Sequence, residues 1–170
     1  MRRVVGHTGA LSDPRLSLSG AGVAANSGKK WWRVRVDDYT SSSQSAFSLD
    51  AVELRSIPGG ADVTASDIDT VASRAFGYGT RSLTTGGPGS VFSGASGDFW
   101  NAAQEDPERA VGYRFAEQTE INEVVVTERL SSSYTINAIT VQSSADGETW
   151  RDEWSEGGFG GLPAFTSTRP

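Results

Sequence analysis

Short segments in which apolar and polar residues alternate, each closed by turn-forming residues, constrain the fold of this 170-residue chain more than any other feature. The first covers residues 31–36 (WWRVRV), where Trp32, Val34 and Val36 fall on one face and the residues between them on the other. Successive side chains of a strand point to opposite faces, so this alternation predicts a half-buried β-strand.

Further strands are predicted by the same period of two, over residues 47–55, 111–115, 121–127, 134–143 and 149–154. Asp146-Gly147 is a tight-turn dipeptide directly before the last of them, in which Trp150 and Trp154 share one face. Short strands with regular turn signals and almost no helical pattern predict an all-β fold, either a β-sandwich or a jelly roll.

The segment 47–55 (FSLDAVELR) leaves two interpretations open. Its apolar side shifts between Ala51 and Val52, so a strand there requires a bulge or a turn. Leu49, Val52 and Glu53 also fit the 3.6-residue repeat of a helix. Pro58-Gly59-Gly60 ends either element.

Residues 61–110 show weak periodicity and many glycines and serines, which predicts loops with one helical turn near residues 66–73. Residues 86–90 (GGPGS) are rich in glycine, as phosphate-binding loops are, but they lack the lysine and the spacing of a P-loop. We therefore expect a flexible turn there.

Three regions follow from these patterns: an extended arm over residues 1–29, a sandwich over residues 30–156, and a C-terminal tail over residues 157–170. The arm has too few apolar residues to build a core, so we expect it to become ordered only by docking. The tail offers large apolar side chains without a strand pattern, which either cap the sandwich or dock on a neighbouring chain. The candidate assembly contacts are Arg2, Arg3, Arg15, Leu16, Leu18, Phe159, Leu162 and Phe165.

Charge is distributed unevenly along the chain. Residues 1–36 hold seven Arg and Lys against one acid, whereas residues 37–100 hold three against eight and residues 101–170 hold five against twelve. A basic arm on an acidic body favours docking on another subunit or on the same subunit, and a solvated tail is the alternative. The formal net charge of -6 argues against nucleic acid as a partner.

Several classes of protein are disfavoured by composition. The absence of cysteine excludes thiol catalysis, cysteine-ligated zinc and disulfide scaffolds. No apolar run approaches the ~20 residues that span a bilayer, so we expect no integral membrane segment. The first residues, MRRVVGHTGALS, lose their apolar character too early for a cleaved secretory signal.

Residues with catalytic potential are few and scattered. The only histidine, His7, lies in the predicted arm, so a Ser-His-Asp site has little basis. Acidic clusters occur at residues 37–38, 105–108 and 152–153, and we interpret them as solvated charges. The first two could bind a hard cation, but neither has a loop motif such as the EF-hand. We expect no enzyme; a hydrolase is a minor alternative.

Aromatic residues supply the candidate ligand or partner contacts. Trp32 and Trp150 follow the inward alternation of strands and are predicted in the core. Trp100, followed by Asn101, either fills the end of the sandwich or stacks on a sugar ring, and the core is favoured. Tyr78, which lies between two glycines, is predicted to be exposed and to form a binding site with Arg81.

An ordered series of segments resembles the discoidin-like family, the coagulation factor V/VIII type C domain of the galactose-binding-like superfamily, in the version found in bacteriophage structural and adhesin proteins. The series spans about residues 30–154 and reads KWWRVRV, SLDAVELR, GGADVT, SRAF, DFWNA, VGYRF, INEVVVT and ITVQSSADGETW. The resemblance implies a jelly-roll sandwich without catalysis, which presents ligands or partner surfaces on the loops at one end.

The sequence departs from that family where a structural calcium is usual. The turn after the Ala-Phe pair usually carries Asp-Gly, and here it reads Gly77-Tyr78-Gly79. A calcium would have to use Asp67 or Asp69 instead. We therefore expect no cofactor and no metal.

The resemblance also implies a function: a non-enzymatic structural protein in the virion of a tailed bacteriophage, as a tail, fibre or head accessory subunit. Its partners would be other virion proteins and further copies of itself, contacted through the arm and the tail. The alternative is a carbohydrate-binding adhesin that recognises a glycan on the host surface.

Overall fold

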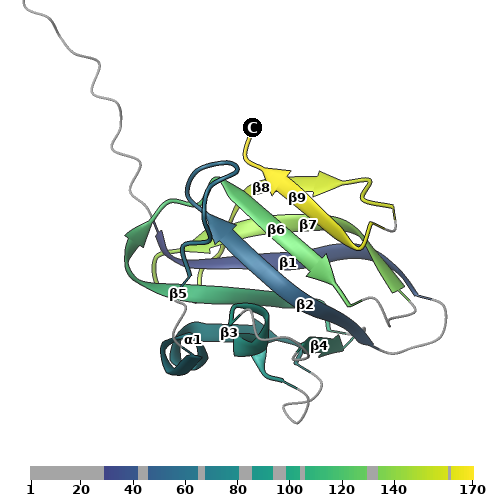
Figure 1. The fold of residues 1–170 in the computed structure, drawn as a ribbon, viewed down its shortest axis with the longest axis horizontal. Helices are drawn as coiled ribbons and strands as arrows, with labels where there is room; N and C mark the ends of the chain where they lie inside the picture. Colours follow the sequence, from purple (N-terminus) through teal and green to yellow (C-terminus); the bar gives the residue numbers. More distant parts are fainter. Residues whose placement is uncertain are drawn as a thin grey trace, which may run out of the picture.

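Two antiparallel β-sheets face each other in a computed structural model of the chain (Figure 1). The five-stranded sheet has the order β3-β5-β1-β7-β8, formed by β1 (Lys29–Ser41), β3 (Ala75–Tyr78), β5 (Ala110–Thr119), β7 (Tyr134–Ser144) and β8 (Arg151–Gly157). The four-stranded sheet has the order β4-β2-β6-β9, formed by β2 (Ala46–Arg55), β4 (Trp100–Ala103), β6 (Glu123–Glu128) and β9 (Ala164–Thr168). The predicted all-β sandwich is confirmed.

The structure describes residues 29–41, 46–64, 68–80, 86–93, 99–103, 106–129, 134–160 and 162–170. The predicted arm lies outside this range up to residue 28, and Lys29 already begins β1. The candidate contacts of the arm therefore also lie outside the described residues: Arg2, Arg3, Arg15, Leu16 and Leu18.

The core lies between the two sheets and is built from the predicted alternation. Trp32, Val34 and Val36 of β1 are buried against the inner face of the other sheet. Each such side chain stabilises the fold by roughly 1.5–3 kcal/mol relative to its exposed state. The fully buried members with the largest side chains are Trp100, Tyr113, Leu49, Leu54, Ile121, Ile136 and Ile139.

The segment with two interpretations is a strand with a bulge. β2 pairs with β6, and its register shifts between Leu49 and Ala51. The shift brings Leu49, before the bulge, and Val52 and Leu54, after it, to the same core.

Helical structure is confined to α1 (Ile68–Arg74) and the 3₁₀ turn η1 (Pro88–Val91) among the described residues. The predicted helical turn near residues 66–73 corresponds to α1, which buries Val71. Val91 at the end of η1 is buried in the same core, so both short elements contribute to the packing at the β3 and β4 side of the sandwich.

The prediction of Trp150 in the core is wrong, whereas Trp154 of the same hairpin is buried. β8 begins at Arg151, and the pairing of β7 with β8 shifts register between Val141 and Gln142. Trp150 therefore precedes the strand and lies half-exposed, outside the alternation that buries Trp154.

The two open sides of the sandwich differ. On one side, where Figure 1 shows β3 and β4 next to α1, a bridge between Thr80 and Ala102 connects the two sheets. The Ala103 N–H also donates to the Gly79 carbonyl oxygen at 2.7 Å. On the other side β8 and β9 run side by side, linked by a 2.9 Å hydrogen bond from Trp154 Nε1 to Ser167 Oγ.

The segment predicted as a C-terminal tail is instead part of the sandwich. β9 pairs along β6, and the rings of Phe159 and Phe165 stack with centroids 3.8 Å apart, both buried in the core. They cap the protein's own sandwich, which was one of the two alternatives. Leu162 between them is 53% exposed.

Buried carboxylates bind residues near the end of the chain, in β9 and directly after it. Glu123 accepts hydrogen bonds from the Arg55 guanidinium at 2.8 Å and from the Gly59 N–H at 3.0 Å. Burial alone would raise the pKa of Glu123, but these donors and the Thr168 hydroxyl together hold it below its ordinary value. Arg169, directly after β9, donates to Glu153 of β8 at 2.8 Å.

Glu128, at the end of β6, is a buried carboxylate whose pKa is shifted in the opposite direction to that of Glu123. Burial raises its pKa, and the Ile136 N–H, which donates to Glu128 Oε1 at 2.7 Å, only partly offsets this. The folded protein therefore holds the Glu128 proton more tightly than the unfolded chain does. Stability consequently falls as the pH rises from the ordinary glutamate pKa through the raised one.

We predict that Glu128→Gln removes this pH dependence. The variant should melt a few degrees above the wild type at about pH 8, and the difference should shrink toward about pH 4, where the wild-type carboxyl is also protonated. Thermal unfolding by circular dichroism at several pH values measures this. Glu117→Gln, at an exposed position of β5, is the matched control. A Glu128→Gln variant that is less stable than the wild type at high pH would contradict the interpretation.

Candidate functional site

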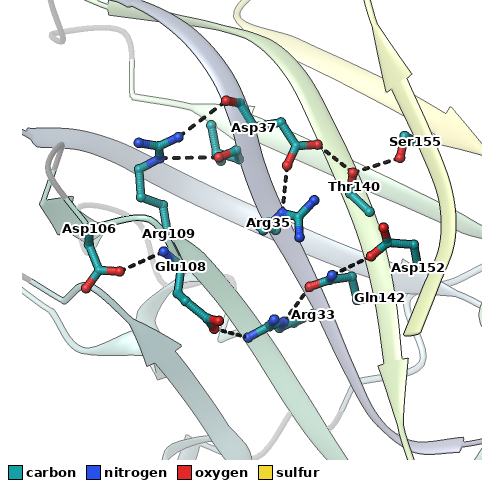
Figure 2. Close-up of polar contacts among 11 residues, drawn as sticks. Arg33, Arg35, Asp37, Asp106, Glu108, Arg109, Thr140, Gln142, Asp152 and Ser155 are labelled. Carbon is teal, nitrogen blue, oxygen red and sulfur yellow. Dashed lines mark hydrogen bonds and ion pairs between the residues drawn. The ribbon is translucent and has the colours of Figure 1, made fainter. Parts of the chain in front are cut away.

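The outer face of the five-stranded sheet carries a network of polar side chains across its central strands (Figure 2). In β1, Arg33, Arg35 and Asp37 point outward because they alternate with the buried core residues. The register sets Arg33 opposite Gln142 of β7 and Arg35 opposite Thr140. Two rows of polar groups therefore run across the sheet.

The first row is centred on Arg33. Its Nε donates to Gln142 Oε1 at 2.6 Å, and Gln142 Nε2 donates in turn to Asp152 Oδ1 of β8 at 2.5 Å. On the other side, Arg33 Nη1 donates to Glu108 Oε2 at 2.9 Å. The Glu108 N–H donates to Asp106 Oδ1 at 2.7 Å, which shapes the loop before β5 (Figure 2).

The second row is centred on Asp37. Its Oδ1 accepts from Arg35 Nε at 2.7 Å, and its Oδ2 accepts from Thr140 Oγ1 at 2.5 Å. Thr140 Oγ1 also lies 2.7 Å from Ser155 Oγ of β8. Arg109 binds the carbonyl oxygen of Asp37 from the other side, at 3.3 Å. Each carboxylate of the two rows thus accepts a hydrogen bond within the network (Figure 2).

Arg33 is buried although it lies on the outer face, with only 3% of its surface exposed. Its guanidinium carbon lies 4.1 Å from the ring centroid of Trp150 and 4.9 Å from that of Tyr78. Aromatic faces attract a guanidinium and exclude water from it. The two rings, Gln142 and Glu108 therefore compensate the burial of this charge.

Four aromatic residues, Trp31, Phe76, Tyr78 and Trp150, form what we call the outer aromatic cluster. Phe76 lies at its centre, with ring centroids 5.4 Å from Trp31, 6.0 Å from Tyr78 and 5.7 Å from Trp150. Gly112 makes room for it, because a Cβ there would lie 2.3 Å from the Phe76 ring. The cluster is half-exposed and covers Arg33.

The Asp146-Gly147 turn holds this cluster in place. Asp146 Oδ1 accepts the N–H groups of Glu148 and Thr149, both at 2.8 Å, and these bonds depress the pKa of Asp146. Gly147 has φ +84°, which favours glycine, and lies against the Trp31 ring. The predicted tight turn is confirmed, and it also buries part of an aromatic surface.

The Gly77-Tyr78-Gly79 sequence has a steric explanation. A Cβ at Gly77 would lie 2.9 Å from Trp100 Nε1, and Gly79 has φ +72° with the Asp106 side chain against it. Both glycines therefore allow the link between β3 and β4. Tyr78 is half-buried rather than exposed as predicted, and its hydroxyl donates to the Gly147 carbonyl oxygen at 3.4 Å.

The described residues among the predicted binding residues have different environments. Trp100 has 0% of its surface exposed, so it is a core residue and does not offer a sugar platform. Its Nε1 donates to Thr80 Oγ1 at 2.9 Å. Asn101, on β4, accepts a hydrogen bond from the Ser48 hydroxyl. Arg81 lies outside the described residues, so its pairing with Tyr78 stays a prediction.

Sequence reasoning misses the two rows as a network. It interprets Asp37, Glu108 and Asp152 as solvated charges, and all three are exposed, but it does not predict that each of them also accepts a hydrogen bond from a side chain on the sheet face. The one feature of the sequence that points to this network is the outward position of Arg33 and Arg35 on a strand with an apolar inner face. Only the strand order shows that Gln142 and Thr140 lie beside them.

No metal site is found among the residues that the structure describes: they include no group of three or more His, Cys, Asp or Glu residues that could hold an ion. Asp67 and the side chain of Asp69, the carboxylates considered for calcium, lie outside that part. No described helix has the length and apolar character needed to cross a bilayer.

Comparisons with known proteins found no matching family model, no matching curated protein and no matching solved structure. The two-sheet architecture is compatible with a discoidin-like or galactose-binding-like domain.

Proposed function

We propose that this chain is a non-enzymatic structural subunit of the virion of a tailed bacteriophage, where it binds neighbouring structural proteins. The observation that supports a role without catalysis is the outer polar network, in which Asp37, Glu108 and Asp152 each accept a hydrogen bond from a neighbouring side chain. A catalytic acid or base works in a cleft with other titratable groups that converge on one substrate, whereas these exposed carboxylates are spread in rows across the outer face of a sheet. The virion assignment is supported by the ordered resemblance in sequence alone.

Attachment to neighbouring proteins is assigned to residues 1–28. This segment holds Arg2, Arg3 and Arg15 against the single acid Asp13, while most of the remaining chain is acidic. A basic segment of this kind fits an acidic surface on a neighbouring subunit, by groove filling or strand addition. The first strand of the sandwich, β1, begins at Lys29, directly after this segment.

Deletion of residues 1–28 is therefore expected to leave a folded domain and to abolish incorporation into particles. The measurement is the amount of the chain in purified particles by quantitative immunoblot, together with thermal unfolding of the isolated protein. A full-length variant with Arg2, Arg3 and Arg15 replaced by Ser tests whether incorporation depends on the positive charge of the arm or only on its length. We expect it to incorporate at least about tenfold less, the effect of ~1.4 kcal/mol of lost binding energy.

The arm hypothesis fails if the truncated chain enters particles at the wild-type level. A truncated chain that does not fold would show that the arm belongs to the domain.

A further inference from the structure

β9 is an edge strand whose outer side has no partner in the described part of the chain. The four-stranded sheet ends at β9 on one side, whereas its other edge, β4, is tied to β3 through Thr80 and Ala102. An edge strand presents unpaired backbone groups that can template another strand.

The register of β6 and β9 shows which groups of β9 point outward. Ser167 lies opposite Val124 and Phe165 opposite Val126, and the Glu128 N–H donates to the Pro163 carbonyl oxygen at 2.9 Å. Hydrogen-bonded and non-hydrogen-bonded pairs alternate along an antiparallel ladder. The N–H and C=O groups that point away from the sheet therefore belong to Ala164, Thr166 and Thr168.

The two neighbouring edges carry different side chains. β8 is charged, with Arg151, Asp152 and Glu156 all exposed, and charges of this kind protect an edge against pairing. A self-paired β8 centred on Trp154 would also set Asp152 opposite Glu156 of a second copy, which is repulsive. β9 (AFTST) has no charged residue and no proline.

We propose that two copies of this chain pair antiparallel through β9, with Thr166 on the two-fold axis. This arrangement sets Thr166 opposite Thr166, and Ala164 opposite Thr168, so every outward backbone group of one copy meets an outward group of the other. Threonine pairs across antiparallel strands are favourable, and a symmetric interface of this kind closes at two subunits. The exposed Leu162 would then lie near Pro170 of the second copy. The inference does not rest on the proposed virion function.

Sedimentation equilibrium of the full-length protein tests this pairing. The wild type should show twice the 18.0 kDa mass of the chain. Thr166→Lys sets two ammonium groups opposite each other on the axis and leaves the ladder with β6 unchanged, so it should raise the dissociation constant of the dimer at least about 100-fold. Gln118→Lys, which adds the same charge at an exposed position of β5, should stay dimeric.

A wild-type protein that stays at 18.0 kDa up to a concentration of about 100 μM would overturn the proposal, because a dimer weaker than this is a marginal interface. A Thr166→Lys variant that associates as strongly as the wild type would place the interface elsewhere and would also overturn it.

Thiol cross-linking gives a second measurement that does not require a lysine at the axis. The chain has no cysteine, so Thr166→Cys creates a single thiol, which the symmetric pairing brings close to its counterpart. A short bis-maleimide linker should convert this variant to covalent dimers and leave Gln118→Cys largely monomeric. Equal cross-linking of the two variants would contradict pairing through β9.

Discussion

Arg33→Ala is expected to lower the free energy of unfolding by about 3 kcal/mol, because it removes the centre of the outer polar network. The exposed ion pair is the smaller part of this effect: the Glu108 side chain is 56% exposed and can be solvated when the arginine is lost. The larger part comes from Gln142, whose buried carbonyl oxygen loses its donor, and from the contacts of the guanidinium with Trp150 and Tyr78. Urea unfolding followed by tryptophan fluorescence measures the change.

Arg35→Ala is the matched control, two residues along the same strand. Arg35 pairs with Asp37, but its side chain is 30% exposed, so we expect a loss of less than about 1 kcal/mol. Equal losses for the two variants would mean that burial between the rings does not distinguish Arg33. The outer network would then be an ordinary set of surface contacts.

Trp100→Ala is expected to have the largest effect of any single substitution discussed, with a loss of about 3–5 kcal/mol. Trp100 has no exposed surface, and its removal leaves a cavity beside Gly77, which has no side chain of its own to fill the space. It also leaves Thr80 Oγ1 without the indole N–H, at the point where β3 joins β4. Chemical denaturation, or the fraction of soluble protein if the variant does not fold, measures the loss.

Trp150→Ala is the comparison variant, because Trp150 belongs to the outer aromatic cluster and not to the core. Trp150 is half-exposed, so its removal should cost clearly less than removal of Trp100. Trp100→Phe keeps most of the apolar volume and should recover much of the stability lost in the alanine variant. If Trp100→Ala folded with wild-type stability, Trp100 would be free for a ligand, and the assignment to the core would be wrong.

The strands with strong alternation can be predicted because their inner faces carry large apolar residues. β1 and the bulge in β2 follow directly from positions such as Trp32, Val34 and Leu49. β9 cannot be predicted in the same way, since its inner face consists of Phe165 and Ser167 only. A strand with one large apolar residue has almost no period to detect, so the sequence pattern indicates a tail where the structure has a strand.

The outer network is harder to predict because its contacts are distant in sequence. Gln142 lies 109 residues from Arg33, and the rings that cover Arg33 come from β3 and from the turn before β8. Alternation correctly predicts the outward direction of Arg33. It carries no information on how much an outward side chain is covered by neighbouring strands, and this also explains why the prediction of an exposed Tyr78 is wrong.

The proposed function is that this chain works by contact with other proteins in an assembled particle. If the proposal is right, the gene for this chain lies in the genome of a tailed phage, and mass spectrometry of purified particles of that phage is the decisive measurement. The account predicts peptides of the chain in a constant ratio to the other structural proteins after stringent washing. Particles that are complete and infectious but contain no such peptides would contradict it.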